Sequence, residues 1–173
     1  MWDSEYWGQD YWGADYWGEA PFIPPIVVTD PDLAISIREA ILGDMVITPL
    51  LSTYLGDPAV FTRTPVPGGA DYPMIVISRN VIKVNQDGVH DYRPTVAYQI
   101  ATYGKNSAPP EQYRAISTIA YEIRTLLHRQ HNLSLTDWTI TDQVCSGPVD
   151  QPSADQITAR VVTLTARLAQ LAA

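Results

Sequence analysis

The chain has 173 residues, of which 46% are hydrophobic, and this is enough for one globular domain with a buried core. Its single cysteine, Cys145, excludes an intrachain disulfide framework, and the lack of any run of 18 apolar residues excludes a membrane-spanning helix. The net charge is −8, but residues 1–37 hold seven acids and no base, so the remainder is nearly neutral and offers no basic field for nucleic acid.

Residues 5–19 repeat the unit acid-Tyr-Trp-Gly-x three times with a period of five. This period matches neither a helix nor a strand, and a glycine in every copy weakens both. Tyrosine and tryptophan bring large contact areas with few torsions, so they serve as interface anchors. The sequence predicts an arm that lies on another chain; a disordered tail and a carbohydrate-binding aromatic strip are the alternatives. The aromatic residues of this arm are Trp2, Tyr6, Trp7, Tyr11, Trp12, Tyr16 and Trp17.

Residues 20–29 contain three prolines among apolar residues and are predicted to form an extended tether. Ten extended residues span about 30 Å. We therefore expect two parts: an arm with its tether over residues 1–29, and a folded domain over residues 30–173.

The first half of the domain begins with a helix, because Asp30 is a suitable N-cap, Pro31 suits the first turn and Gly43 suits the C-terminus. Residues 45–55 are expected to be short helical or irregular, and residues 60–62 a short strand. A proline- and glycine-rich loop follows over residues 64–73. Strand residues 74–78 and 82–85 then lead into an Asp87-Gly88 hairpin turn, and the return strand covers residues 95–103.

The second half is predicted to start with a helix at Pro109 and Pro110, with an apolar stripe from Tyr113 to Leu127. A strand over 133–144, a loop over 147–155 and a long strand over 156–168 follow. Val161-Val162 shifts the apolar phase of the last strand, which indicates a bulge or a change of buried face. This order indicates an α+β fold, with an antiparallel or mixed β-sheet packed against two main helices and an extended aromatic N-terminal arm.

Catalytic motifs are absent from the sequence. It contains no glycine-rich phosphate-binding motif and no nucleophile elbow. His128 and His131 have helical spacing, but no further ligands complete a metal site, so they are expected to be helix-end cations. Cys145 has no histidine near it in sequence and is expected to be a small, half-buried apolar residue. We therefore expect no enzyme activity, no metal and no cofactor.

Several segments carry a resemblance, in their order along the chain. They are residues 59–63, Tyr72-Pro73 leading into residues 74–77, Asp87-Gly88, residues 101–104, the helix over 113–127 ending in paired leucines, and residues 160–164. In this order the chain resembles the tail-terminator, or tail-completion, proteins of long-tailed phages and gene transfer agents. The aromatic arm departs from that family's pattern.

The resemblance implies a structural virion protein of the tail-neck region, assembled in the host cytoplasm. Such proteins form a ring, usually a hexamer, that caps the tail tube and joins it to the head connector. The implied partners are further copies of the chain, the tail-tube protein and the connector or adaptor, with DNA passing through the lumen without sequence-specific contacts and with no membrane. Two alternatives stay open: another neck or head–tail adaptor protein, and a carbohydrate-binding module that uses the repeat. The candidate inter-ring loop residues are Pro65, Pro67, Asp71, Asp87, Gly88 and His90.

Overall fold

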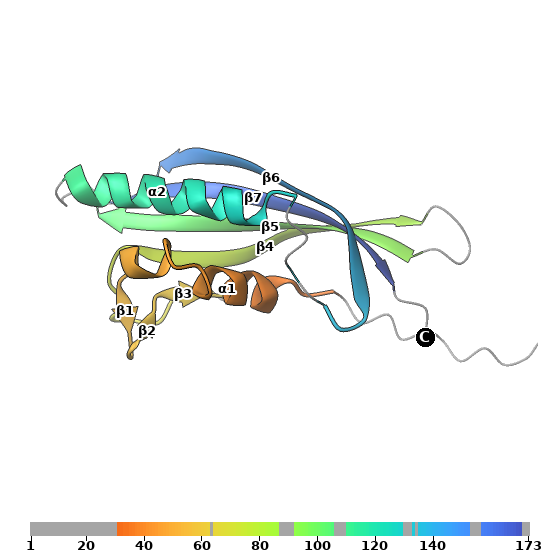
Figure 1. The fold of residues 1–173 in the computed structure, drawn as a ribbon, viewed down its shortest axis with the longest axis horizontal. Helices are drawn as coiled ribbons and strands as arrows, with labels where there is room; N and C mark the ends of the chain where they lie inside the picture. Colours follow the sequence, from red (N-terminus) through yellow and green to blue (C-terminus); the bar gives the residue numbers. More distant parts are fainter. Residues whose placement is uncertain are drawn as a thin grey trace, which may run out of the picture. The chain divides into compact units, whose positions relative to one another are not determined.

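Four long strands build the sheet of this protein, and two α-helices cover one face of it (Figure 1). The computed structural model describes residues 31–62, 64–86, 92–105, 110–129, 133, 135–152 and 157–170. The aromatic arm, its tether and the turn residues Asp87, Gly88 and His90 lie outside the described residues.

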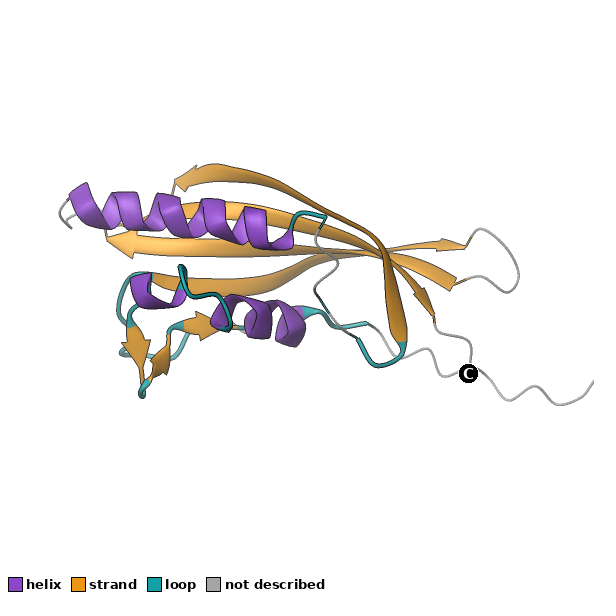
Figure 2. Cartoon of the chain, in the orientation of Figure 1, coloured by secondary structure: helices purple, strands orange, loops and turns teal. Residues whose placement is uncertain are grey.

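The five-stranded sheet has the order β3-β4-β5-β7-β6. Its strands are β3 (Val60–Phe61), β4 (Met74–Gln86), β5 (Tyr92–Lys105), β6 (Trp138–Pro152) and β7 (Ile157–Gln170). Only the β3–β4 pair is parallel, so the sheet is mixed. With the helices α1 (Ala34–Leu42) and α2 (Pro110–Leu127), this confirms the predicted α+β class (Figure 2).

Side chains of alternate residues on β5 and β7 form the core beneath the helices. Tyr98 and Ile100 of β5 and Val162 and Leu164 of β7 are fully buried there. The apolar stripe of α2 is confirmed over Ile116, Ile119, Ala120, Ile123 and Leu127, which are all buried. Tyr113 was expected to belong to this stripe, but it is half exposed and contacts the polar side chain of Arg160.

The α2 helix lies very close to β5 at Gly104. A Cβ atom on Gly104 would lie only 1.9 Å from Cδ1 of Ile116, so the close approach of helix and sheet depends on this glycine.

The α1 helix starts later than predicted. Leu33 is its N-cap residue, and the predicted N-cap, Asp30, lies outside the described residues. Just before the helix, Oδ1 of Asp32 accepts hydrogen bonds from the Ala34 amide at 2.9 Å and from the Tyr98 hydroxyl at 2.8 Å. The Tyr98 hydroxyl in turn accepts one from the Leu33 amide at 2.9 Å. A buried tyrosine in the middle of the sheet thus fixes the start of the helix, a contact between residues 66 positions apart.

The region after α1 is more structured than expected. It contains the short helix η4 (Thr48–Leu50), which fits the prediction, and a small hairpin of β1 (Thr53–Tyr54) and β2 (Asp57–Pro58), which was not predicted. Leu55 and Gly56 form its tip with positive φ angles of 53° and 93°. The hairpin was missed because its strands have only two residues each.

The predicted limits of β6 are wrong. The strand begins at Trp138, not at 133, and continues through residues 147–152, which were predicted to be a loop. The glycine and proline at 147 and 148 sit in a bulge of the strand, since the register with β7 shifts between Ser146 and Val149. The bulge predicted in β7 at Val161-Val162 is also wrong: β7 pairs with β5 without a shift, and the irregularity is in the neighbouring strand.

The strands are longer than the helices that cover them. The 18 residues of α2 span about 27 Å, whereas the 14 residues of β5 span about 46 Å. The β4–β5 hairpin and the end of β7 therefore extend beyond α2 (Figure 1). In the described part of the chain, no helix has the length and apolarity needed to span a bilayer.

Candidate functional site

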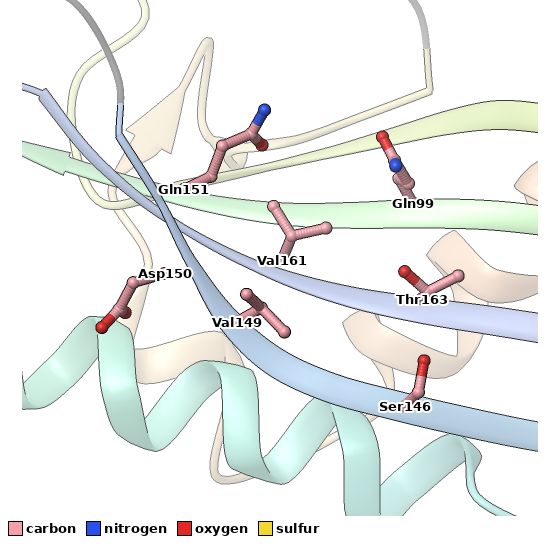
Figure 3. Close-up of a pocket in the computed structure, with 7 residues that line it drawn as sticks. All are labelled: Gln99, Ser146, Val149, Asp150, Gln151, Val161 and Thr163. Carbon is pink, nitrogen blue, oxygen red and sulfur yellow. The ribbon is translucent and has the colours of Figure 1, made fainter.

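The open face of the sheet, opposite the helices, carries a shallow hollow at the β5–β7–β6 strands (Figure 3). Its cavity volume is about 260 Å³. Side chains alternate across a strand, so Gln99 lines this hollow while its neighbour Tyr98 lies in the core. The residues of this open-face hollow are Gln99, Ser146, Val149, Asp150, Gln151, Val161 and Thr163.

The bulge in β6 shapes the hollow. Ser146 pairs with Thr163 and Val149 pairs with Val161, so β6 carries one extra residue over this interval. Gly147 adopts a φ of +98°, and a Cβ atom there would lie 2.7 Å from the carbonyl oxygen of Val161. Only glycine fits this position. The bulge directs Val149 outward, and 64% of this valine is exposed.

The hollow has an apolar centre and an uncharged polar margin. Val149 and Val161 lie next to each other at its centre, and Val161 is 9% exposed (Figure 3). The amides of Gln99 and Gln151 and the hydroxyls of Ser146 and Thr163 surround them. This combination suits a group that is mostly apolar with one polar edge, because the amides and hydroxyls both donate and accept hydrogen bonds.

Asp150 is the one ionisable side chain of the lining, and it turns toward α2 (Figure 3). Its Oδ1 lies 2.8 Å from Nε of Arg160, but the N–H group does not point at the oxygen, so this contact is an ion pair without a hydrogen bond. Nη2 of Arg160 donates to the Tyr113 hydroxyl at 2.9 Å, and the guanidinium lies 5.1 Å from the centre of that ring. Arg160 therefore links β6 and β7 to the first turns of α2. Asp150 has no second carboxylate beside it in the lining for acid–base chemistry.

The predicted inter-ring loop lies apart from the hollow, since none of Pro65, Pro67 and Asp71 lines it. Pro65 is exposed and Pro67 is half-buried. A turn follows in which the Ala70 amide donates to the carbonyl of Pro67 at 3.4 Å. The loop is accessible for the most part, and the other predicted site residues lie outside the described part of the chain.

Asp71 fixes the end of this loop. Its Oδ1 accepts from the Tyr72 amide at 3.0 Å and from Nζ of Lys105 at 3.2 Å, and its carbonyl accepts from Oγ of Ser52 at 2.7 Å. The Tyr72 amide, followed by Lys105, lowers the pKa of Asp71 below its usual value. Asp71 is thus a charged anchor that joins the loop to β5.

Exposed apolar side chains mark further surfaces that the sequence pattern does not predict. Met45, after α1, is 91% exposed, and Leu55, at the tip of the β1–β2 hairpin, is 90% exposed. Their exposure follows from loops whose position the sequence pattern does not fix. The other large apolar residues that are exposed are Ile35, Val46, Tyr113, Tyr121 and Val149.

Cys145 and His128 form a structural contact. Nδ1 of His128 accepts a hydrogen bond from the Cys145 amide at 3.1 Å. Burial raises the pKa of the Cys145 thiol to about 11, although Arg124 acts in the opposite direction. The thiol is therefore protonated at neutral pH and is a poor nucleophile. His131 lies outside the described residues, and no group of three or more His, Cys, Asp or Glu residues that could hold a metal ion occurs among those that are described.

Comparison with known proteins gives a likeness of fold. No family model matches the chain, and no curated protein matches it. Among solved structures, it is similar to a chain in "Virion of native gene transfer agent (GTA) particle", with a TM-score of 0.60 and 15% sequence identity. The match covers 79% of this chain and 94% of that chain.

Proposed function

We propose that this protein is a structural component of a virion, and that it acts as a tail terminator. In this role copies of the chain form a ring that caps the tail tube and joins it to the head connector. The observation that carries the proposal is the fold likeness to a chain of a gene transfer agent virion, which extends over 94% of that chain. The order of elements supports it, since the two helices and the long strands follow one another as expected for a tail terminator.

The chemistry of the described surface supports a role in assembly rather than in catalysis. The polar margin of the open-face hollow is uncharged except for the carboxylate of Asp150, which contacts Arg160. The buried Cys145 thiol is protonated at neutral pH. These groups can recognise a protein surface, but they do not form a set of nucleophile, base and orienting residue.

Ring formation needs a surface that differs between the two sides of the subunit. In a ring each subunit presents one patch to the next and a different patch to the previous one. Met45 and Leu55 are almost fully exposed apolar side chains on loops, and Val149 is an exposed apolar residue on the open sheet face. These are separate elements of the fold, so the described surface offers unlike patches for heterologous contacts.

The inter-ring contacts and the arm belong to the same proposal. The loop containing Pro65, Pro67 and Asp71 and the hairpin turn containing Asp87, Gly88 and His90 would contact the adjoining rings. The Tyr-Trp-Gly arm would lie on a neighbouring copy or ring, and several copies of the arm would act together by avidity.

The mass of the purified protein in solution, alone and with tail-tube protein, tests the proposal. We expect a ring with a mass six times the 19.2 kDa of one chain, and a complex when tube protein is added. A protein that is monomeric at every concentration and does not bind the tube contradicts it. Locating the subunit in a particle reconstruction separates a tail terminator from a head-side adaptor.

Deletion of residues 2–19 tests the arm. We expect the shortened protein to keep its fold but to join heads and tails less efficiently, measured as the fraction of complete particles. Normal assembly and infection by particles with the shortened protein would contradict this part of the proposal.

A further inference from the structure

The open-face hollow has an apolar centre in which Val149 is exposed, and the arm carries seven aromatic side chains. We propose that the hollow binds the Tyr-Trp-Gly repeat of a second copy of this chain, with one aromatic side chain over Val149 and Val161. This inference rests on the proposed function, because it takes the arm to bind a neighbouring copy, and it adds the surface on which the arm docks.

The chemistry of the hollow fits an aromatic ring with a polar edge. An indole or a phenol is apolar over most of its surface and carries one N–H or O–H group. The two valines offer an apolar contact, while the carbonyl oxygens of Gln99 and Gln151 can accept a hydrogen bond from the ring. Glycine in each repeat allows the peptide backbone to approach the sheet closely.

The size of the hollow also favours single side chains. Its volume of about 260 Å³ lies below the roughly 300–1,000 Å³ of pockets for drug-sized ligands. The three repeats offer the same pair of rings three times, so a shift of the arm by one repeat presents an equivalent pair.

The acidic arm can pair with a cation at one end of the hollow. Each repeat places an acid before its tyrosine, and residues 1–30 contain no base. One exposed cation, Arg167, lies on the open face four residues from Thr163 along β7. Lys105, at the other end of the hollow, already forms an ion pair with Asp71. Four strand residues span about 13 Å, which is within the roughly 17 Å of one extended five-residue repeat.

The position of the first described residues favours a second copy as the donor of the arm. Asp32 binds Tyr98 on the helix-covered side of the sheet, whereas the adjacent Gln99 lines the hollow on the opposite side. The chain therefore enters the domain on the face that does not carry the hollow. An arm of a neighbouring subunit can approach the open face without passing around the sheet.

Cross-linking of the full-length protein tests this docking. Trp12→p-benzoylphenylalanine places a photoreactive group in the middle repeat, and a mixture of ¹⁵N-labelled and unlabelled protein distinguishes links between copies from links within one copy. We expect links between copies to peptides that contain Ser146–Gln151 or Ala159–Thr163. The mass of the assembly is measured in the same sample.

Val149→Asp in the same protein provides the matched test, because Val149 is exposed and its replacement adds an acid that repels the acidic arm. We expect the yield of these links to fall by about tenfold, as for loss of a central interface contact. Thr118→Asp, an equal charge change at an exposed position of α2, should leave the yield unchanged.

The outcomes separate the two proposals. A ring whose links fall on other surfaces, or whose links to the hollow survive Val149→Asp, overturns the docking site and leaves the ring proposal standing. Links only within one copy also overturn it. A monomer with no links between copies overturns both proposals.

Discussion

The two faces of the sheet differ in composition although the same strands build them. On the helix face Val162 and Leu164 of β7 are fully buried, whereas on the open face Thr163 is half-buried and Thr165 and Arg167 are exposed. Burial of apolar surface stabilises the fold, so the helix face contributes most of the stability. On β7 the open face is the more polar of the two, although Val161 is buried there, so it contributes less to stability and leaves Thr165 and Arg167 available for recognition.

The largest expected effect comes from filling the contact between α2 and the sheet. Gly104→Val places methyl groups where the Cδ1 atom of Ile116 already lies, so α2 must move away from β5. We expect a loss of about 3 kcal/mol in the free energy of unfolding, measured by denaturant titration. Combining it with Ile116→Ala should recover part of the loss, and no recovery would show that the contact is not the cause.

Substitutions of two adjacent valines compare directly how much each face of the sheet contributes to stability. Val162→Ala leaves a cavity in the core and should cost about 2–3 kcal/mol, whereas Val161→Ala removes methyl groups on the open face and should cost about 1 kcal/mol. Both losses of stability are measured by chemical denaturation of proteins that differ from the wild type only at the substituted valine. Equal losses would mean that the open face is packed as tightly as the helix face.

The hydrogen bonds that fix the start of α1 give the next effect. Tyr98→Phe removes the hydroxyl that donates to Asp32 and accepts from the Leu33 amide. Because these groups are buried, we expect a loss of about 1–2 kcal/mol at neutral pH, measured by denaturation. An unchanged stability would show that water replaces the hydroxyl.

The same tyrosine predicts a dependence of stability on pH. Burial, and next the hydrogen bond to Asp32, raise the pKa of Tyr98 from 10.0 to about 12. The folded protein then holds this proton more tightly than the unfolded chain, so the stability is full below pH 10 and falls as the pH rises toward 12, by up to about 2–3 kcal/mol. Tyr98→Phe should have a shallower decline over this range; Cys145 is present in both proteins and does not affect the difference.

The bulge in β6 turns Val149 toward the open face, and Gly147→Ala tests how much this bulge depends on a glycine. A Cβ atom at this position meets the Val161 carbonyl and requires a left-handed backbone, so we expect a loss of about 1–3 kcal/mol. Gly68→Ala is the matched control, since no atom lies within 4 Å of its Cβ position and its φ is not in the left-handed region. Equal effects of the two substitutions would contradict the role given to the bulge.

The smallest effect on stability is expected at Val149. Val149→Ser replaces an exposed apolar side chain, and the free energy of unfolding should change by less than about 0.5 kcal/mol. If the open face is a contact surface, the same change should weaken association, measured by the mass in solution as a function of concentration. A large loss of stability would show that Val149 belongs to the core.

Periodicity in the sequence was sufficient to predict the helices and the central hairpin. The apolar stripe from Ile116 to Leu127 and the alternation along β5 each reflect burial on one face, and this pattern is local. It predicted the α+β class correctly. It failed at β6, because Gly147 and Pro148 resemble a loop unless the partner strand that tolerates a bulge is known.

The sequence by itself determined the two main helices, the strands of the central hairpin and many of the apolar residues of the core, because these properties depend on neighbours along the chain. Only the tertiary structure decided that Asp32 joins Tyr98 to the start of α1, that Val149 is turned outward beside Val161, and that Gly104 lies against Ile116. Each of these contacts joins residues that are distant in sequence, and their geometry is set by how strands and helices pack in space.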